Sequence, residues 1–185
     1  MRIDRLDIAE VLVITPDRFG DSRGYFSETY SAARLAEAGI AAAFVQDNQS
    51  FSQAAGTVRG LHCQVAPSVQ GKLVRVLRGA IWDVVVDARA GSASFGRHVA
   101  AELSAENGRQ IWVPPGFLHG FCTTAPNTEI AYKVTAPYDR AAERGVAWTD
   151  PTLALPWPIE ADQAVLSEKD AALPGWAAAA DWFAA

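Results

Sequence analysis

The sequence predicts an all-β protein, an antiparallel sandwich or jelly roll with minor helices. Short segments rich in β-branched and aromatic residues follow one another along the chain, and Gly, Pro, Asn or Ser separates them at intervals close to about 8–12 residues. Long helices do not alternate with these segments, which argues against a parallel sheet. The length of 185 residues is that of one domain, and a domain of this size buries about 70% of its unfolded surface. We therefore expect residues 1–185 to form one jelly-roll domain.

An early helix and a series of strands account for most of the chain. Ser31 is a suitable N-cap residue, residues 32–38 form the body of the helix, and Gly39 ends it. The predicted strands are Ala43–Ser50, Thr57–Gln64, Lys72–Leu77, Ile81–Asp87, Arg97–Leu103, Arg109–Val113, Leu118–Thr124 and Glu129–Thr135. The Ala/Trp-rich tail, residues 171–185, is expected to form a weak helix that docks through its aromatic side chains.

The composition excludes several classes of protein. The 16 basic and 21 acidic residues give a net charge of −5, so nucleic acid is not expected as a partner. Uninterrupted apolar runs stay well short of the roughly 20 residues of a membrane span, and no membrane partner is expected. Arg2, Asp4 and Arg5 stand where a secretory signal would be apolar. With Cys63 and Cys122 too few for a disulfide framework or a zinc cluster, we expect a cytoplasmic protein with free thiols.

Strand alternation places several ionisable side chains on faces that are otherwise apolar, because residues i and i+2 share a face. The sets are Lys72 with Val74 and Val76, Asp83 with Ile81 and Val85, His119 with Phe121, and Tyr132 with Ile130 and Val134. Burial of an ionisable group is costly unless the group is paired or used. A structural network accounts for one or two such groups, whereas a set on successive strands indicates a site inside the barrel.

Two histidine motifs raise the question of a metal. His119 ends a Pro-x-Gly-x-x-His spacing, which the metal-binding jelly-roll proteins called cupins use, and His62 lies in an earlier strand. A cupin metal site also needs a His-x-His pair and a nearby glutamate. Here Gln64 occupies the second position of the pair, and the next ionisable residue is the cation Lys72. We therefore predict no metal and favour organic acid–base chemistry.

Other residues have both a functional and a structural interpretation. Arg23 and Arg59 stand beside glycines and suit a bidentate phosphate clamp, or else a surface ion pair. A lone histidine such as His62 is more often structural than catalytic, whereas an inward-facing Lys72 needs an anionic partner or a role at developing negative charge. Aromatic residues that stack on a base, or else belong to the core, are Phe19, Phe26 and Tyr138. These residues alone indicate a β-barrel enzyme with acid–base chemistry and a phosphorylated ligand.

A larger set of segments is specific in combination and covers nearly the whole chain. The segments are 17–24 with Phe26 and Glu28, then 46–48, 58–62, 70–76, 113–116, 119–121, 131–133, 137–138 and 166–170. In this order they resemble the dTDP-4-dehydrorhamnose 3,5-epimerases of deoxysugar biosynthesis.

The resemblance implies a cupin-type jelly roll that works without a metal or cofactor, usually as a homodimer that shares a strand near its N-terminus. The implied reaction inverts C3 and C5 of a 4-keto-6-deoxyhexose carried on thymidine diphosphate, giving dTDP-4-dehydro-L-rhamnose. Both carbons flank the C4 ketone, so loss of either proton gives an enolate delocalised onto O4. By this resemblance His62 is the base and Asp170 orients it, Lys72 stabilises the enolate oxygen, and Tyr132 returns a proton to the opposite face.

The resemblance also assigns contacts to the dTDP-sugar substrate. Arg23, Arg59 and Lys169 are expected at the diphosphate, His119 at the sugar, and Glu143 at a further contact. The nucleoside is assigned to Glu28, Gln46, Asp47 and Asn48, with Phe19 and Tyr138 stacking on it, and Asp83 is expected to support the site side chains from behind.

Small departures and three alternatives stay open. Cys63 stands where the family usually has an aromatic residue, and Gln49 where a histidine is common. Arg59 and His62 have opposite parity in a regular strand, so either Gly60 forms a bulge or Arg59 reaches round from the strand's start. The alternatives are a mono-epimerase acting at C3 or C5, a 3,4-ketoisomerase on a related dTDP-4-keto-6-deoxysugar, and a non-enzymatic jelly roll that binds sugar nucleotides.

Overall fold

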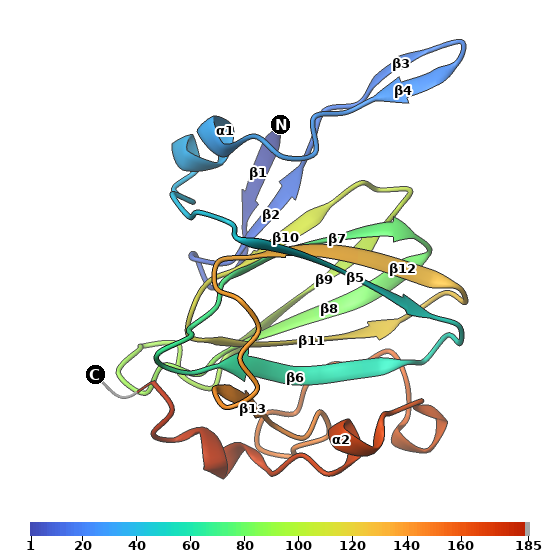
Figure 1. The fold of residues 1–185 in the computed structure, drawn as a ribbon. Helices are drawn as coiled ribbons and strands as arrows, with labels where there is room; N and C mark the ends of the chain where they lie inside the picture. The colour runs from blue at the N-terminus through green and yellow to red at the C-terminus, as the bar shows by residue number, and fades with distance from the viewer. Residues whose placement is uncertain (184–185) are drawn as a thin grey trace.

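The computed structural model describes residues 1–183, in which two antiparallel sheets face each other and a small hairpin stands apart from both (Figure 1). The six-stranded sheet consists, in spatial order, of β1 (Arg2–Arg5), β2 (Leu12–Thr15), β10 (Gln110–Val113), β7 (Lys72–Arg78), β12 (Thr128–Val134) and β5 (Gln46–Ser52). The five-stranded sheet consists of β13 (Glu143–Gly145), β6 (Val58–Gln64), β11 (Phe117–Thr123), β8 (Ala80–Asp87) and β9 (His98–Ser104). The hairpin consists of β3 (Phe19–Asp21) and β4 (Gly24–Phe26).

The order of the strands is that of a jelly roll. From β5 to β8, and again from β9 to β12, the chain crosses from one sheet to the other at each connection. Such crossing between two antiparallel sheets is typical of the jelly roll. The predicted fold class is therefore confirmed. Seven of the eight predicted strands form within one residue of their expected ends, whereas β5 begins three residues later than the predicted Ala43 and ends two residues later than the predicted Ser50.

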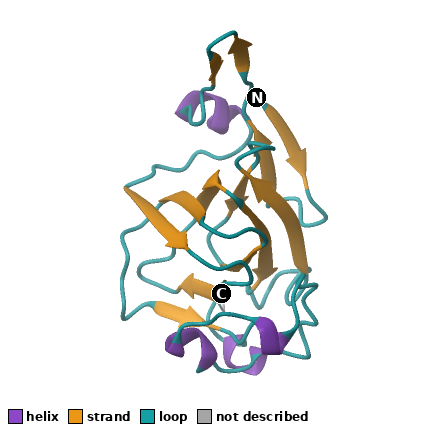
Figure 2. Ribbon diagram, turned by 90° about the vertical axis from the view of Figure 1, so that its right-hand side faces the viewer, coloured by secondary structure: helices purple, strands orange, loops and turns teal. Residues whose placement is uncertain are grey.

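The main core lies between the sheets, where the predicted inward faces meet. Val74 and Val76 from the six-stranded sheet pack with Ile81 and Val85 from the five-stranded sheet. A second apolar cluster covers the outer face of the five-stranded sheet, where the C-terminal segment packs through side chains such as Trp157. Figure 2 shows the helical turns of this segment against that sheet. Burial on both faces explains why every residue of β11 is buried.

The two α-helices lie on different sides of the molecule. Helix α1 (Ala32–Glu37) places Leu35 against Ile14 and Trp112 on the outer face of the six-stranded sheet. It ends one residue before its predicted limit, and Gly39 follows with φ of +93°. Helix α2 (Glu168–Ala171) and the 3-10 turns η1 (Ala161–Gln163) and η2 (Trp176–Ala179) belong to the C-terminal segment. No helix among residues 1–183 has both the length and the apolar character of a membrane span.

The structure differs from the sequence prediction at the two ends of the chain. Strands β1 to β4 and β13 have three or four residues each, too few for alternation to be read, and they form because neighbouring strands pair with them. In the tail, 171–185, the expected helix is reduced to the turn η2, whose Trp176 packs on Phe95 with ring centroids 5.0 Å apart. Residues 184–185 of the predicted tail lie outside the described residues.

Candidate active site

A cavity of about 280 Å³ opens between the two sheets and gathers the four predicted catalytic residues together with three of the predicted substrate contacts. Strands of both sheets and the short helix α2 contribute to its wall. The lining residues are Ser50, Arg59, His62, Lys72, His119, Phe121, Ile130, Tyr132, Ser167, Lys169 and Asp170. The side chains expected to do chemistry therefore meet in one place, although they come from distant parts of the sequence.

His62 and Asp170 are in contact on one wall of this cavity. Nε2 of His62 lies 2.6 Å from Oδ1 of Asp170, although neither atom has a hydrogen bond of regular geometry within the described residues. Burial raises the pKa of Asp170, but the His62 and Ser167 contacts outweigh it, and the net shift is downward. The carboxylate is therefore ionised at neutral pH, and it leaves Nδ1 as the histidine nitrogen that can accept a proton.

A β-bulge in β6 lets two residues of opposite parity line the same cavity. His62 pairs with His119, and Arg59 pairs with Phe121, so three residues along β6 match two along β11. Gly60 lies in this bulge with φ of +112°, and a Cβ there would come within 2.7 Å of the His119 carbonyl oxygen. The structure thus adopts the bulge, the first of the two geometries that the parity of Arg59 and His62 allowed.

Lys72 and Tyr132 lie on the paired strands β7 and β12. Both side chains point from the inner face of the six-stranded sheet into the cavity. The Lys72 Nζ lies 3.5 Å from the His62 carbonyl oxygen, and burial lowers the pKa of its ammonium, an effect that the charges of Asp83 and Glu143 partly oppose. Burial raises the pKa of the Tyr132 hydroxyl, so this group is protonated at neutral pH. The cavity therefore brings an imidazole, a phenol and a lysine amine together.

A second histidine–carboxylate pair lies beside the first. His119 is the cross-strand partner of His62, and its Nε2 lies 2.8 Å from Oδ2 of Asp83. Asp83 is completely buried, whereas His119 reaches the cavity. The structure thus places Asp83 directly behind His119, and the contact orients the imidazole toward the interior.

An adjoining cavity of about 170 Å³ shares His62, Lys72 and Tyr132 with the first. Glu143 closes its outer side, where Oε1 lies 2.5 Å from Nζ of Lys169 and Oε2 accepts a 2.8 Å hydrogen bond from the Tyr138 hydroxyl. Burial raises the pKa of Glu143, but Lys169 and Tyr138 lower it overall. Two more predicted residues meet here: Asn48 lines the cavity and accepts a 2.7 Å hydrogen bond from Gln46 Nε2.

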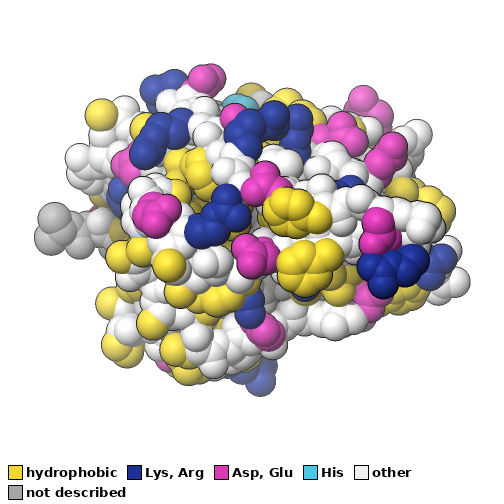
Figure 3. Space-filling model, turned by 90° about the horizontal axis from the view of Figure 1, so that it is seen from above, with side chains coloured by type: hydrophobic (Ala, Val, Ile, Leu, Met, Phe, Trp, Pro, Cys, Tyr) yellow, Lys and Arg dark blue, Asp and Glu magenta, His cyan; other side chains and the backbone are white. Residues whose placement is uncertain are grey.

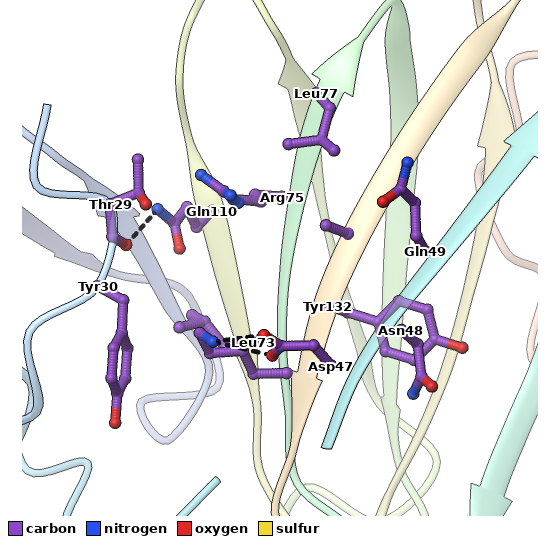
Figure 4. A pocket seen from close by; sticks show the side chains of 12 residues that line it. Thr29, Tyr30, Asp47, Asn48, Gln49, Leu73, Arg75, Leu77, Gln110 and Tyr132 are labelled. Carbon is purple, nitrogen blue, oxygen red and sulfur yellow. Dashed lines mark hydrogen bonds and ion pairs between the residues drawn. The ribbon is translucent and has the colours of Figure 1, made fainter. Parts of the chain in front are cut away.

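Four predicted residues lie away from these cavities. Asp47 points to the outer face of the six-stranded sheet, where it pairs with Lys133 at 2.8 Å. There it lines a separate cavity of about 450 Å³, from which the Tyr132 hydroxyl is directed away (Figure 4). The other three belong to the β3–β4 hairpin and the segment after it: Phe19, Arg23 and Glu28. Their contacts within one chain are local, such as the 2.6 Å pair of Arg23 with Asp21.

The residues around the histidines do not fit a metal site. Gln64 is committed to the backbone, since its Nε2 donates to the Ser68 and Pro137 carbonyl oxygens and its Oε1 accepts from the Asp139 N–H. Lys72 brings an amine into the cavity, where a cupin metal site would need a carboxylate ligand. Within residues 1–183, His, Cys, Asp and Glu side chains do not gather in threes in a metal-binding arrangement.

Ser167 is a site residue that the sequence analysis missed. Its hydroxyl accepts from the Asp170 N–H at 3.0 Å and donates to Asp170 Oδ2 at 2.9 Å. Ser167 is the N-cap of α2, and serine followed three residues later by an acidic residue is a recognisable capping pattern. That signal was available in the sequence. Ser50, Phe121 and Ile130 also line the cavity, but only the folded strands bring them there.

Comparison with known proteins agrees with this geometry. The family model for dTDP-4-dehydrorhamnose 3,5-epimerase matches residues 5–178. A dTDP-4-dehydrorhamnose 3,5-epimerase from Sinorhizobium fredii NGR234 is 52% identical over 94% of this chain and 89% of its own length.

Two solved structures extend the comparison to three dimensions. The 3,5-epimerase of Bacillus anthracis, with TDP and PPi bound, superposes with a TM-score of 0.91 at 44% identity, covering 94% of this chain and 98% of its own. The dTDP-6-deoxy-D-glucose-3,5-epimerase of Legionella pneumophila, in complex with dTDP-4-keto-L-rhamnose, has a TM-score of 0.90 at 46% identity, covering 94% and 92%. Family model, sequence identity and superposition agree over nearly the whole chain, and this chain therefore belongs to the dTDP-4-dehydrorhamnose 3,5-epimerase family of isomerases.

Proposed function

We propose that this enzyme inverts C3 and C5 of dTDP-4-dehydro-6-deoxy-D-glucose by metal-free acid–base enolisation. One observation carries the proposal: a histidine paired with a buried carboxylate, a lysine amine and a protonated phenol line the same cavity. The dTDP-4-keto-L-rhamnose bound to the Legionella pneumophila relative supports the choice of substrate class.

In the proposed reaction His62 removes the proton from the carbon next to the C4 ketone. The C–H bond breaks, the proton moves to Nδ1, and the electron pair delocalises onto O4. Asp170, at 2.6 Å from Nε2, stabilises the imidazolium that forms. Lys72 stands at the cavity wall to stabilise the enolate oxygen, and one such partner contributes about 10²–10³-fold in rate.

Tyr132 then protonates the same carbon from the opposite face of the sugar, which inverts it. The raised pKa of this tyrosine keeps its proton available at neutral pH. The tyrosinate regains a proton and His62 loses one, so each cycle balances without an oxidant or a reductant. Because C3 and C5 both flank the ketone, the same set of groups serves both carbons in succession, and no cofactor is required.

The cationic side of the cavity suits the diphosphate. Arg59 and Lys169 line it together with His119, and Arg59 is held in place by a 3.2 Å hydrogen bond to the Phe51 carbonyl oxygen. The adjoining cavity, with Tyr138 and Asn48, suits the nucleoside. The TDP and PPi bound to the Bacillus anthracis relative support a nucleoside diphosphate as the recognised group.

We also propose that the enzyme is a homodimer in which the hairpin of each chain completes the site of the other. Phe19 and Phe26 are 60% and 65% exposed, and the hairpin stands clear of its own sheets (Figure 1). On the outer face of the six-stranded sheet Phe51 is also exposed. Figure 3 looks onto this side of the molecule and shows hydrophobic side chains among charged ones. Contact between two copies would cover these groups and bring Arg23 to a substrate.

We propose a cytoplasmic location, with no nucleic acid or membrane as partner. The buried free thiols of Cys63 and Cys122 suit a reducing compartment, and the net charge of −5 does not favour a nucleic-acid backbone.

The decisive experiment is incubation with dTDP-4-keto-6-deoxyglucose in D₂O, followed by mass spectrometry and NMR of the product. Deuterium at both C3 and C5 is the expected result. Deuterium at one carbon would make the protein a mono-epimerase, and a ketone moved to C3 would make it a 3,4-ketoisomerase. Absence of uptake from protein that still binds the nucleotide would favour a binding protein and refute the proposal.

A further inference from the structure

An arginine at the base of the β3–β4 hairpin binds to a turn in the body of the molecule. Arg18, immediately before β3, donates from Nη1 to the Glu106 carbonyl oxygen at 2.5 Å and from Nη2 to the Ala105 carbonyl oxygen at 2.6 Å. Its guanidinium also lies over the ring of Tyr25 in β4, 4.6 Å from the centroid. Arg18 therefore links both strands of the hairpin to the β9–β10 turn.

The β9–β10 turn is itself well ordered by hydrogen bonds. The Ser104 N–H donates to Asn107 Oδ1 at 3.0 Å, and the Asn107 N–H donates to Ser104 Oγ at 2.9 Å. The Arg109 N–H donates to the same Asn107 oxygen at 2.9 Å. These bonds leave the carbonyl groups of the turn directed at Arg18, so the guanidinium binds to a rigid partner.

Gly108 makes room for this contact. A Cβ at this position would lie 2.7 Å from Nη2 and 3.0 Å from Cζ of Arg18. Gly108 also has φ of +64°, a region that favours glycine. A side chain at residue 108 would therefore displace the guanidinium from the turn. The Arg18 contact thus requires glycine at this position.

Other hydrogen bonds hold the two ends of the hairpin but not its strands. Ser27 Oγ donates to the Asp17 carbonyl oxygen at 2.8 Å, which clamps the two ends together. Gln110 Nε2 donates to the Thr29 carbonyl oxygen at 2.8 Å, as Figure 4 shows. Neither bond reaches β3 or β4, whereas Arg18 contacts the ring of Tyr25 on β4 and adjoins β3. The direction of the hairpin thus depends on Arg18.

We infer that Arg18 is a positioning residue that sets the direction of the hairpin, so that Arg23 and Phe19 reach the substrate bound by a second copy. The inference rests on the proposed function and its shared site. Arg18 itself is committed to its own turn and does not touch substrate. Its loss would let the hairpin swing, so that fewer molecules present Arg23 correctly at any time, and the apparent affinity for substrate would fall in proportion.

The test compares Arg18→Ala with Arg2→Ala, an exposed arginine that pairs with Asp4 on its own strand at 3.0 Å. For Arg18→Ala we expect KM, and the Kd for thymidine diphosphate by calorimetry, to rise about tenfold, equivalent to about 1.4 kcal/mol, with little change in kcat. Arg18→Lys keeps the positive charge but loses the planar guanidinium that donates two hydrogen bonds. Its KM and Kd should therefore lie between those of the wild type and those of Arg18→Ala. Arg2→Ala should behave as the wild type.

A mixing experiment separates positioning of a partner's site from a role within one chain. Arg18→Ala chains, which keep an intact cavity, are exchanged with His62→Ala chains, which keep an intact hairpin. In mixed dimers the working cavity receives a normal hairpin, so KM should return to the wild-type value. A wild-type KM in Arg18→Ala alone, or a raised KM that mixing does not restore, would overturn the inference. Failure of the proposed function is seen separately, as wild-type protein that sediments as a monomer or takes up no deuterium.

Discussion

The Tyr132→Phe substitution tests the proposed acid while it leaves the other groups of the site unchanged. It removes one hydroxyl group and leaves the ring that packs against the inter-sheet core. Burial raises the pKa of this hydroxyl, and Arg59 and Glu143 affect that pKa through their charges alone. The hydroxyl makes no hydrogen bond to a protein group within residues 1–183. The substitution therefore leaves no protein partner unsatisfied, and we expect the free energy of unfolding to change by less than about 0.5 kcal/mol.

The expected effect on catalysis is much larger. A positioned general acid contributes about 10²–10⁴-fold, or roughly 2.7–5.4 kcal/mol of barrier, and kcat should fall by this factor. Because His62 and Lys72 stay in place, enolisation itself should continue. We expect deuterium from D₂O to enter the recovered substrate with retained configuration, while inversion is lost.

Three measurements check this prediction: kcat by product formation, deuterium content of recovered substrate by NMR, and thymidine diphosphate binding by calorimetry. Unchanged binding and continued exchange without inversion would assign Tyr132 to protonation on the second face. Inversion within tenfold of the wild-type rate would refute the role of the acid. Loss of nucleotide binding together with turnover would show that the hydroxyl is structural.

Three further predictions concern the proposed base His62, the effect of a chelator and the pH dependence of folding stability. His62→Ala should lose both exchange and turnover by orders of magnitude while still binding thymidine diphosphate; persistent exchange would assign the base elsewhere. A chelator should leave activity unchanged, and inactivation restored by added metal would overturn the metal-free proposal. Burial raises the pKa of Asp87, but hydrogen bonds from Arg89, Ser92 and Ser94 lower it to about 2 from 3.8, which corresponds to about 2 kcal/mol of stability. Because this folded-state pKa is depressed, the contribution is present above pH 3.8 and is lost as the pH falls toward 2. Asp87→Asn should therefore lower the unfolding free energy at pH 7 but much less near pH 2, and a difference independent of pH in urea titrations would contradict the assignment.

The strands of both sheets could be predicted because alternation is a local property. Side chains of a half-buried strand alternate between core and surface over a few residues, and the sets around Val74, Val85 and Ile130 do face the core. The same rule placed Lys72 and Tyr132 on the interior. The short strands β1 to β4 could not be read this way, because three or four residues carry too little pattern and their pairing comes from neighbours distant in sequence.

The chemistry of the site was predicted in part by spacing and in part by resemblance. His62 and His119 stood out through their motifs, whereas Asp170 was assigned by resemblance to a family. The fold supplies the physical reason for that assignment: helix α2 returns to β6 and places the carboxylate 2.6 Å from the imidazole. His62 and Asp170 are far apart in the sequence, so rules based on neighbouring residues cannot predict that the two side chains meet.

By itself, the sequence determined the residue types, the inward faces and the fold class, since each depends on neighbours along the chain. The tertiary structure decided two further points. The bulge at Gly60 brings Arg59 and His62 to one cavity despite their parity, because the partner strand β11 supplies fewer residues over the same length. The hairpin carries Phe19 and Arg23 away from the cavity of their own chain, because Arg18 binds to a turn that pairing across the six-stranded sheet places beside it.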